Sequence, residues 1–513
     1  MPEDAVPESL ADSSLTHRTI HAARWRSGSL LLQGMIQFGL GVVLARLLPP
    51  ADFGLAALAM VVVGFVATLA DAGLSSAVVY RRPLTERHVR VSFTISLIVA
   101  FALAAGLVAV APYTATPFRN RALPEVLRVE SLLFVFTALG TTALALLRRG
   151  LDFRRLFVIE VSSYLAGYAF VAVALALLGF GVWSLVLGTL AQAALASGVA
   201  LVMCRHSLRP LLAVEESRQL FDYGAAATLN SVVSYAARTA DSFIVGRWLG
   251  VSALGLYTRA LNVIAVPLYY LGNTTTGVLF PAMSEIRSDA ERFRTAYFFG
   301  VQITVLIAAP LCAFVVVAAP HLIIGLYGER WSGATLPLQI LAAAGLFRAV
   351  ARFGGVVTYA SGNVMAEVWR QAAFTLILVV GGVIGAAWGV AGVAVGLGVA
   401  MLFMYLAMTH LSLRIVGGAW RDFLAAHLPG LVLSLQVGAV GIAVRSMLEV
   451  RGVASTWVLI SIMVGGVASL PVGIFLLPRR LRPVALFSRF SVPISRLPRP
   501  VRLPLMWMLR LET

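Results

Sequence analysis

The stretch from Leu44 to Arg82 constrains the fold more than any other part of this chain of 513 residues. It holds a Pro-Pro turn, about two dozen mostly apolar residues, one acid (Asp71) within that run, and a closing arginine pair. About 20 apolar residues rising 1.5 Å each cross the ~30 Å hydrocarbon layer of a membrane. The stretch therefore predicts a transmembrane helix. A carboxylate at that depth is costly, which makes Asp71 a functional candidate, although it also lies late enough in the helix to act as a cap or a local partner.

A second copy of this pattern begins 201 residues later. Six residues recur at that offset: Arg46, Leu48, Gly54, Leu55, Ala59 and Val62 match Arg247, Leu249, Gly255, Leu256, Ala260 and Val263. The recurrence predicts a chain built from two copies of one membrane unit. Six helices separate the copies, so both have the same orientation and are related by a pseudo-two-fold axis along the membrane normal.

Composition supports a membrane protein, because 59% of the residues are hydrophobic and only 12% are charged. A soluble globular chain carries about a quarter of its residues as charges. The net charge of +17 comes from arginine alone. Arginine-rich cytoplasmic loops explain that balance, so we expect no nucleic-acid partner. The two cysteines and seven histidines show no metal-ligand spacing, and we expect no metal or other cofactor.

Apolar runs and their punctuation predict an all-α, polytopic fold of fourteen helices. GFG at 179–181 and AWG at 387–389 predict tight hairpins. The expected helices lie at about 23–47, 54–79, 91–112, 124–147, 156–178, 181–203, 221–246, 256–282, 295–318, 334–359, 368–388, 390–412, 422–444 and 455–477.

The loop arginines predict how the chain is oriented. With the N-terminus in the cytoplasm, 28 arginines fall in cytoplasmic segments and 7 on the opposite side. This alternation indicates a multi-pass protein of the cell (inner) membrane with both termini in the cytoplasm. We expect a cytoplasmic N-terminal tail (1–22), an N-terminal six-helix bundle (23–203), a cytoplasmic linker (204–220), a C-terminal six-helix bundle (221–412), two extra helices (413–477) and a basic cytoplasmic tail (478–513). The basic tail either binds anionic membrane lipids or only fixes the orientation of the chain.

Buried polar residues are the candidates for function. Asn230, Ser234, Arg238 and Asp241 follow at intervals of 4, 4 and 3 in the seventh helix, within about 80° of arc. Arg238 and Asp241 are spaced to pair with each other, so the stripe faces either a cavity or a neighbouring helix.

The tenth helix carries the strongest binding candidates. Arg348 and Arg352 lie one turn apart, roughly midway along it. Each would cost about 2.5–3.5 kcal/mol on insertion scales if it faced lipid. We therefore expect both to face protein, water or an anion.

Three further candidates lie on other helices. Glu130 shares a polar face of the fourth helix, with Arg128 just off that face, and Arg259 lies in the eighth. Arg128 and Arg259 are near predicted helix ends, so snorkelling to headgroups is the alternative to substrate binding.

Several stretches together resemble the Wzx/WzxC-like polysaccharide flippases of the multidrug/oligosaccharidyl-lipid/polysaccharide exporter superfamily. They are the opening stretch, LLRRGLDFRR at 146–155, GFGVWSLVLG at 179–188 and DSFIVGRWLGVSALGLYTRA at 241–260. The likeness runs from about residue 24 to 360 and more weakly to 477. It implies a V-shaped pair of six-helix bundles with two extra helices.

The resemblance also implies a function, which is transport of a polyprenyl-(pyro)phosphate-linked oligosaccharide to the outer leaflet by alternating access. Arg348 and Arg352 would attract the pyrophosphate with help from Arg238, while Asn230, Arg128 and Arg259 would line the path. Asp71, Glu130 and Asp241 are the acids that would couple transport to Na+ or H+. A polysaccharide polymerase and export machinery are the possible protein partners.

Two other functions compete with this reading. A multidrug exporter of the same superfamily would line its cleft with acids, whereas arginine prevails here. An enzyme acting on lipid-linked glycans would carry a sizeable outer loop, and the expected outer segments do not exceed about twenty residues. We therefore expect a transporter and not an enzyme.

Overall fold

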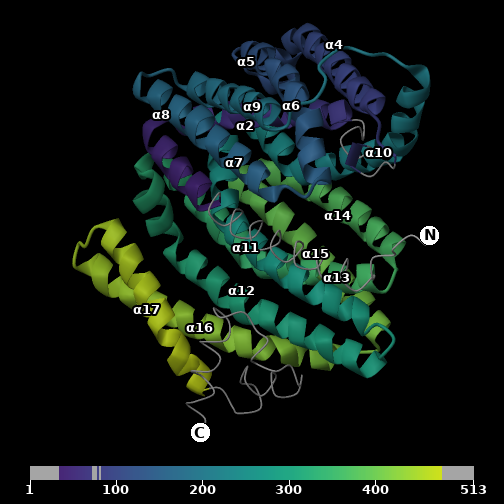
Figure 1. The fold of residues 1–513 in the computed structure, drawn as a ribbon. Coiled ribbons are helices and arrows are strands. Elements are labelled where there is room, and N and C mark those ends of the chain that lie inside the picture. Colours follow the sequence, from purple (N-terminus) through teal and green to yellow (C-terminus); the bar gives the residue numbers. More distant parts are fainter. Residues whose placement is uncertain (1–33, 72–77, 80–82, 477–513) are drawn as a thin grey trace. The chain divides into compact units, whose positions relative to one another are not determined.

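A computed structural model of the chain describes residues 34–71, 78–79 and 83–476 (Figure 1). Every regular element in these ranges is a helix, which confirms the all-α fold class. The expected tails at 1–22 and 478–513 lie outside the described residues.

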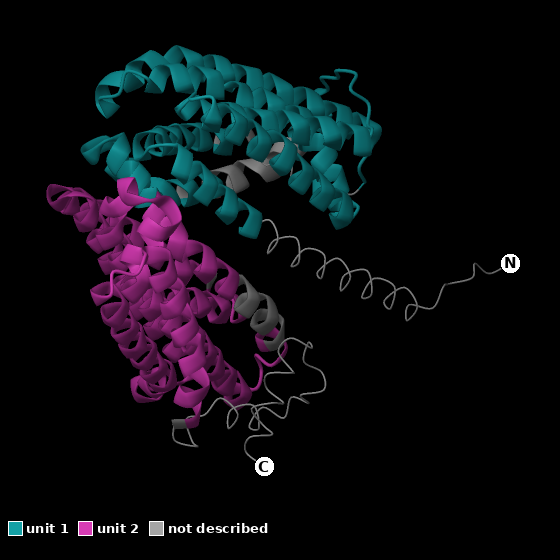
Figure 2. Ribbon diagram, turned by 90° about the vertical axis from the view of Figure 1, so that its left-hand side faces the viewer, with its two compact units in different colours: residues 1–258 teal, residues 259–513 magenta. Residues whose placement is uncertain are grey.

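The chain forms two compact units, Met1–Thr258 and Arg259–Thr513 (Figure 2). The boundary between the units falls within α11 (Val251–Glu285), C-terminal to the linker expected at 204–220. The bundle boundaries expected from the sequence stay a prediction. In the first unit the structure describes α2 (Pro50–Asp71), α4 (Glu86–Phe118), α5 (Leu123–Glu130), α6 (Leu132–Arg149), α7 (Phe153–Ser163), the π-helix η1 (Tyr164–Ala169), α8 (Phe170–Leu177), α9 (Val182–Met203), α10 (Val214–Ile244), the π-helix η2 (Val245–Leu249) and the start of α11 (Val251–Glu285).

The second unit continues α11 and is organised around the long helix α12. Its main core gathers buried side chains of α12, α13, α15 and α16, with Phe353 and Phe423 among the largest. Its helices are α12 (Ala290–Tyr327), the 3-10 helix η3 (Glu329–Ala334), α13 (Thr335–Ala360), α14 (Val364–Gly385), the 3-10 helix η4 (Ala386–Trp388), α15 (Gly389–Val416), α16 (Trp420–Val450) and α17 (Ser455–Leu476).

The described helices are long and apolar enough to make this a multi-pass membrane protein. Eleven stretches could cross a bilayer, and one of them, Met365–Val416, contains both α14 and α15. The helix Gly34–Leu47 is shorter, and α10 is not among the eleven. The count of fourteen therefore stays a prediction.

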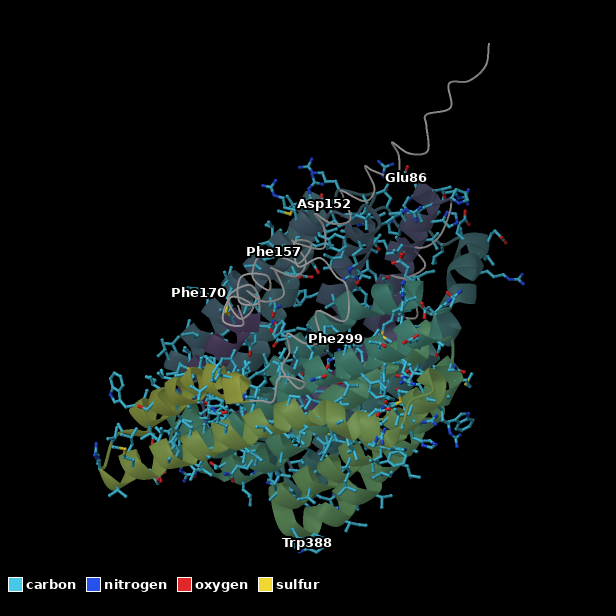
Figure 3. All side chains as sticks on the ribbon, turned by 90° about the horizontal axis from the view of Figure 1, so that it is seen from below. Glu86, Asp152, Phe157, Phe170, Phe299 and Trp388 are labelled. Atoms are coloured by element: carbon cyan, nitrogen blue, oxygen red, sulfur yellow. The ribbon has the colours of Figure 1, made fainter. Side chains whose placement is uncertain are left out.

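The expected tight hairpins are present. α8 ends at Leu177 and α9 begins at Val182, with Gly179 and Gly181 both at positive φ between them. The turn between α14 and α15 likewise ends at Gly389, whose φ is 71°. Trp388 lies at the tip of that hairpin (Figure 3) and is exposed. Glycine supports both turns because it adopts positive φ at little steric cost.

Two helices expected to be continuous are interrupted. The predicted helix 124–147 is divided at Ser131 into α5 and α6. The predicted helix 156–178 contains the π-helix η1, where the rings of Tyr164 and Tyr168 stack 5.4 Å apart. π-Helical turns are rare and break the regular spacing of side-chain faces.

The two copies of the sequence repeat touch each other through equivalent residues. A Cβ on Gly54 would lie 1.6 Å from the carbonyl oxygen of Val251, and a Cβ on Gly255 would lie 2.0 Å from that of Pro50. Because both pairs are related by the 201-residue offset, the contact is reciprocal, as at a two-fold interface. The first turns of α2 and α11 therefore pack backbone against backbone, which only glycine permits.

The expected linker is fastened to α4. Arg90 donates hydrogen bonds to the carbonyl oxygens of Arg209 (3.1 Å) and Pro210 (3.4 Å), and the Leu211 amide donates to Thr94 Oγ1 at 2.9 Å. Residues 204–213 run without helix between α9 and α10. These hydrogen bonds satisfy backbone groups that a helix would otherwise pair.

Candidate functional site

The nine residues expected to carry function divide between the two units. The side chains of Asp71, at the end of α2, and Asn230, within α10, lie outside the described residues. The first unit contains Asp71, Arg128, Glu130, Asn230, Arg238 and Asp241, and the second contains Arg259, Arg348 and Arg352.

Arg348 and Arg352 form one exposed cationic face on α13. The span that contains α13 is the most enclosed of the eleven. Sixteen of the 26 residues of α13 are buried, whereas both arginines are exposed, as are Leu336 (55%), Ala343 and Tyr359 (54%). Residues four and eleven positions apart lie on the same helical face. The arrangement supplies two cations on one face of a membrane-spanning helix, where charge is costly unless it meets water, protein or an anion.

Arg352 is held against α11 by an aromatic ring. Its guanidinium carbon lies 5.2 Å from the centroid of Tyr269, a cation–π distance. Its side chain also passes over Gly272, where a Cβ would come within 3.0 Å of Arg352 Cδ. The third arginine of this unit, Arg259, is half-buried on α11 and within electrostatic reach of Tyr327.

An acid lies near this face of α13. A Cβ on Gly355, one turn beyond Arg352, would be 3.4 Å from Glu367 Oε1 of α14. The other oxygen, Glu367 Oε2, is buried and makes no hydrogen bond within the described part of the chain. The face is thus not uniformly cationic, since a carboxylate approaches it from the neighbouring helix.

Asp241 and Arg238 occupy different environments on α10. Asp241 is buried and accepts hydrogen bonds from Tyr257 OH (2.9 Å) and from the Ser242 amide (2.7 Å). Arg238 is exposed, and its guanidinium carbon lies 5.9 Å from the ring centroid of Tyr235. The mutual pair that their spacing favours stays a prediction. The Tyr257 hydroxyl in turn links α10 to α11.

Glu130 and Arg128 lie at the break between α5 and α6 but point to different surroundings. Glu130 is the last residue of α5, is 2% exposed, and its Oε2 makes no hydrogen bond to any residue that the structure describes. Arg128 is exposed, and its carbonyl oxygen accepts from Ser131 Oγ at 2.6 Å. A buried carboxyl of this kind is a candidate for reversible ion or proton binding.

Sequence reasoning missed Tyr257, Tyr269, Gly272 and Glu367 as neighbours of the candidates. Their contacts join residues on different helices, so no spacing within one helix indicates them. In the described ranges no three His, Cys, Asp or Glu side chains gather as metal ligands would.

Comparison with known proteins identifies the family. The family model described as "Polysaccharide biosynthesis protein" matches residues 43–336. The lipopolysaccharide biosynthesis protein WzxC of Escherichia coli (strain K12) is 24% identical over 445 residues, which cover 83% of this chain and 89% of WzxC. The succinoglycan biosynthesis transport protein ExoT of Rhizobium meliloti (strain 1021) is 30% identical over 300 residues, covering 58% of this chain and 60% of ExoT.

Solved structures share the fold. The lipid II flippase MurJ in an inward closed conformation matches with a TM-score of 0.70 and 14% identity, covering 88% of this chain and 98% of MurJ. An inward-facing multidrug resistance MATE transporter matches with a TM-score of 0.59 and 17% identity, and the match covers 76% of this chain and 98% of the transporter chain. Since the family model spans more than half of the chain, the expected resemblance is confirmed: the protein belongs to the polysaccharide biosynthesis protein family and is Wzx-like within the multidrug/oligosaccharidyl-lipid/polysaccharide exporter superfamily.

Proposed function

We propose that this protein is a flippase that moves a polyprenyl-(pyro)phosphate-linked oligosaccharide from the cytoplasmic to the outer leaflet for surface polysaccharide biosynthesis. The observation that carries the proposal is the pair Arg348 and Arg352, exposed on the most enclosed candidate span. The names of the relatives support it, since they describe polysaccharide biosynthesis and, for ExoT, transport.

Arginine suits the phosphate end of such a substrate. A guanidinium is planar and always charged, and it donates two parallel hydrogen bonds to phosphate oxygens. Two arginines one helical turn apart match a ligand with two neighbouring phosphates better than a neutral lipid. The polyprenyl tail stays in the bilayer, so the transporter shields only the charged and sugar-bearing part of the substrate.

The mechanism that follows is alternating access without covalent chemistry. Glu130 is the acid we propose for coupling to H+ or Na+, because it is buried and its Oε2 has no hydrogen-bond partner among the described residues. Asp241 already accepts hydrogen bonds from Tyr257 and Ser242. That arrangement suits a structural link between α10 and α11 better than ion exchange.

The protein would act in the inner membrane with both termini in the cytoplasm, as the arginine distribution favours. Anionic lipids would contact its basic loops, and a polymerase and export machinery would receive the translocated saccharide.

Binding in lipid nanodiscs tests the proposal. Wild type should bind a saccharide-bearing polyprenyl pyrophosphate and not the uncharged polyprenol. Arg348→Gln with Arg352→Gln should weaken binding at least about tenfold, the effect of losing one charge-assisted hydrogen bond. Arg421→Gln removes a highly exposed arginine elsewhere and serves as the matched control. Equal binding of both lipids, or preferred binding of an organic cation, would reject the proposal.

A further inference from the structure

The guanidinium of Arg352 rests on two residues of α11. Its carbon lies 5.2 Å from the ring centroid of Tyr269. A Cβ added at Gly272 would meet Arg352 Cδ at 3.0 Å and both Nε and Nη1 at 3.3 Å. Tyr269 and Gly272 are three residues apart and so lie on the same face of their helix. We call the Tyr269 ring and the Gly272 backbone the platform of Arg352.

Each part of the platform has a distinct physical effect. The face of the tyrosine ring attracts the cation, and this attraction grows where water is scarce. Tyr269 and Arg352 both lie in helices that are long and apolar enough to span a membrane. The missing side chain at Gly272 lets the aliphatic part of Arg352 lie directly against the backbone of α11. A Cβ there would be tighter than nine in ten Cβ contacts, so the Arg352 side chain would have to shift by a few tenths of an ångström.

Holding the arginine in place matters for binding. A long arginine side chain samples many rotamers, and freezing them when a ligand binds opposes the association. A guanidinium already held on one face loses less freedom while its N–H groups donate to an anion. The platform leaves Arg352 exposed, and Tyr269 itself is 47% exposed.

We infer that Tyr269 and Gly272 are positioning residues that fix Arg352 for recognition of the substrate's phosphate groups. The inference rests on the proposed function for the identity of the ligand. Tyr269 and Gly272 set the affinity of Arg352 for the phosphate groups, and they lie on α11, whereas the arginine pair lies on α13. Tyr269 acts through its ring and Gly272 through the absence of a side chain.

Polyprenyl pyrophosphate binding in nanodiscs tests the inference. Tyr269→Leu should weaken binding about three- to thirtyfold, which is the free energy of a cation–π contact converted to affinity. Tyr269→Phe keeps the aromatic ring and should bind with wild-type affinity. Gly272→Ala should also weaken binding, although alanine is the better helix former. The controls are Trp457→Leu, which removes an exposed aromatic of α17, and Gly438→Ala, where a Cβ meets nothing within 4 Å. In an Arg352→Gln background Tyr269→Leu should have no further effect.

A second measurement needs no substrate. Phenylglyoxal modifies accessible guanidinium groups, and peptide mass spectrometry gives the rate at each arginine. Tyr269→Leu should accelerate modification of Arg352 and leave the rate at Arg348 unchanged, while Tyr269→Phe should match wild type. If wild type binds no polyprenyl pyrophosphate, the proposed function fails, and the rates alone decide whether the platform holds Arg352. Unchanged rates at Arg352, or unchanged affinity in Tyr269→Leu and Gly272→Ala when wild type binds, would overturn the inference.

Discussion

Replacing Gly54 by alanine should destabilise the first unit through the reciprocal contact of the sequence repeat. The new Cβ would lie 1.6 Å from the carbonyl oxygen of Val251, whereas an ordinary contact begins near 3.4 Å, so the two backbones must separate by about 1.8 Å. Overpacking of this kind costs about 1–3 kcal/mol, and a separation this large belongs at the upper end. Alanine's better helix propensity offsets about 1 kcal/mol. The net loss is about 2 kcal/mol.

Thermal unfolding in detergent, followed by intrinsic fluorescence, measures this effect. For a unit of this size, about 2 kcal/mol lowers the midpoint by about 4–8 °C. Gly106→Ala in α4 is the matched control, because its Cβ would meet nothing within 4 Å and should leave the midpoint unchanged or slightly raised. Gly255→Ala should behave like Gly54→Ala, since its Cβ would lie 2.0 Å from the Pro50 carbonyl oxygen. Equal midpoints for Gly54→Ala and Gly106→Ala would refute the reasoning.

Two further predictions concern single hydrogen-bonding groups. Tyr257→Phe should lower the free energy of unfolding by about 1–3 kcal/mol, because the buried Asp241 carboxylate loses a hydrogen-bond donor at 2.9 Å. Thermal melting curves measure this loss, and Tyr113→Phe, at a highly exposed site, should leave the melting midpoint unchanged. Arg90→Ala should speed amide hydrogen exchange in residues 204–213 by up to about tenfold, because it removes donors to the carbonyl oxygens of Arg209 and Pro210. If amide exchange in residues 204–213 of Arg90→Ala is as slow as in wild type, these hydrogen bonds do not hold the linker against α4.

The helices and hairpins were predictable because their signals are local. Apolar length fixes a membrane helix, and the glycines at 179 and 181 mark a turn in the sequence itself. The repeat was also predictable, because its offset of 201 residues can be found in the sequence and makes Gly54 equivalent to Gly255. The contact between the two copies was not predictable, because an offset does not indicate which equivalent residues meet.

Departures from regular helix were harder to predict. The π-helix at Tyr164–Ala169 and the break at Ser131 change which residues share a face, and the apolar pattern continues through both. The arginine pair on α13 follows from a spacing of four, so the sequence was enough to single it out. The residues around it, Tyr269, Gly272 and Glu367, come from other helices and needed the fold.

Translocation in proteoliposomes tests the central claim most directly. A fluorescent saccharide on polyprenyl pyrophosphate is placed in both leaflets, and a membrane-impermeant quencher reports its movement across the bilayer. Wild type should expose the inner-leaflet pool to the quencher, whereas Arg348→Gln with Arg352→Gln should not, although the double variant melts like wild type. A double variant that translocates at the wild-type rate would contradict the cationic face as the phosphate-binding site.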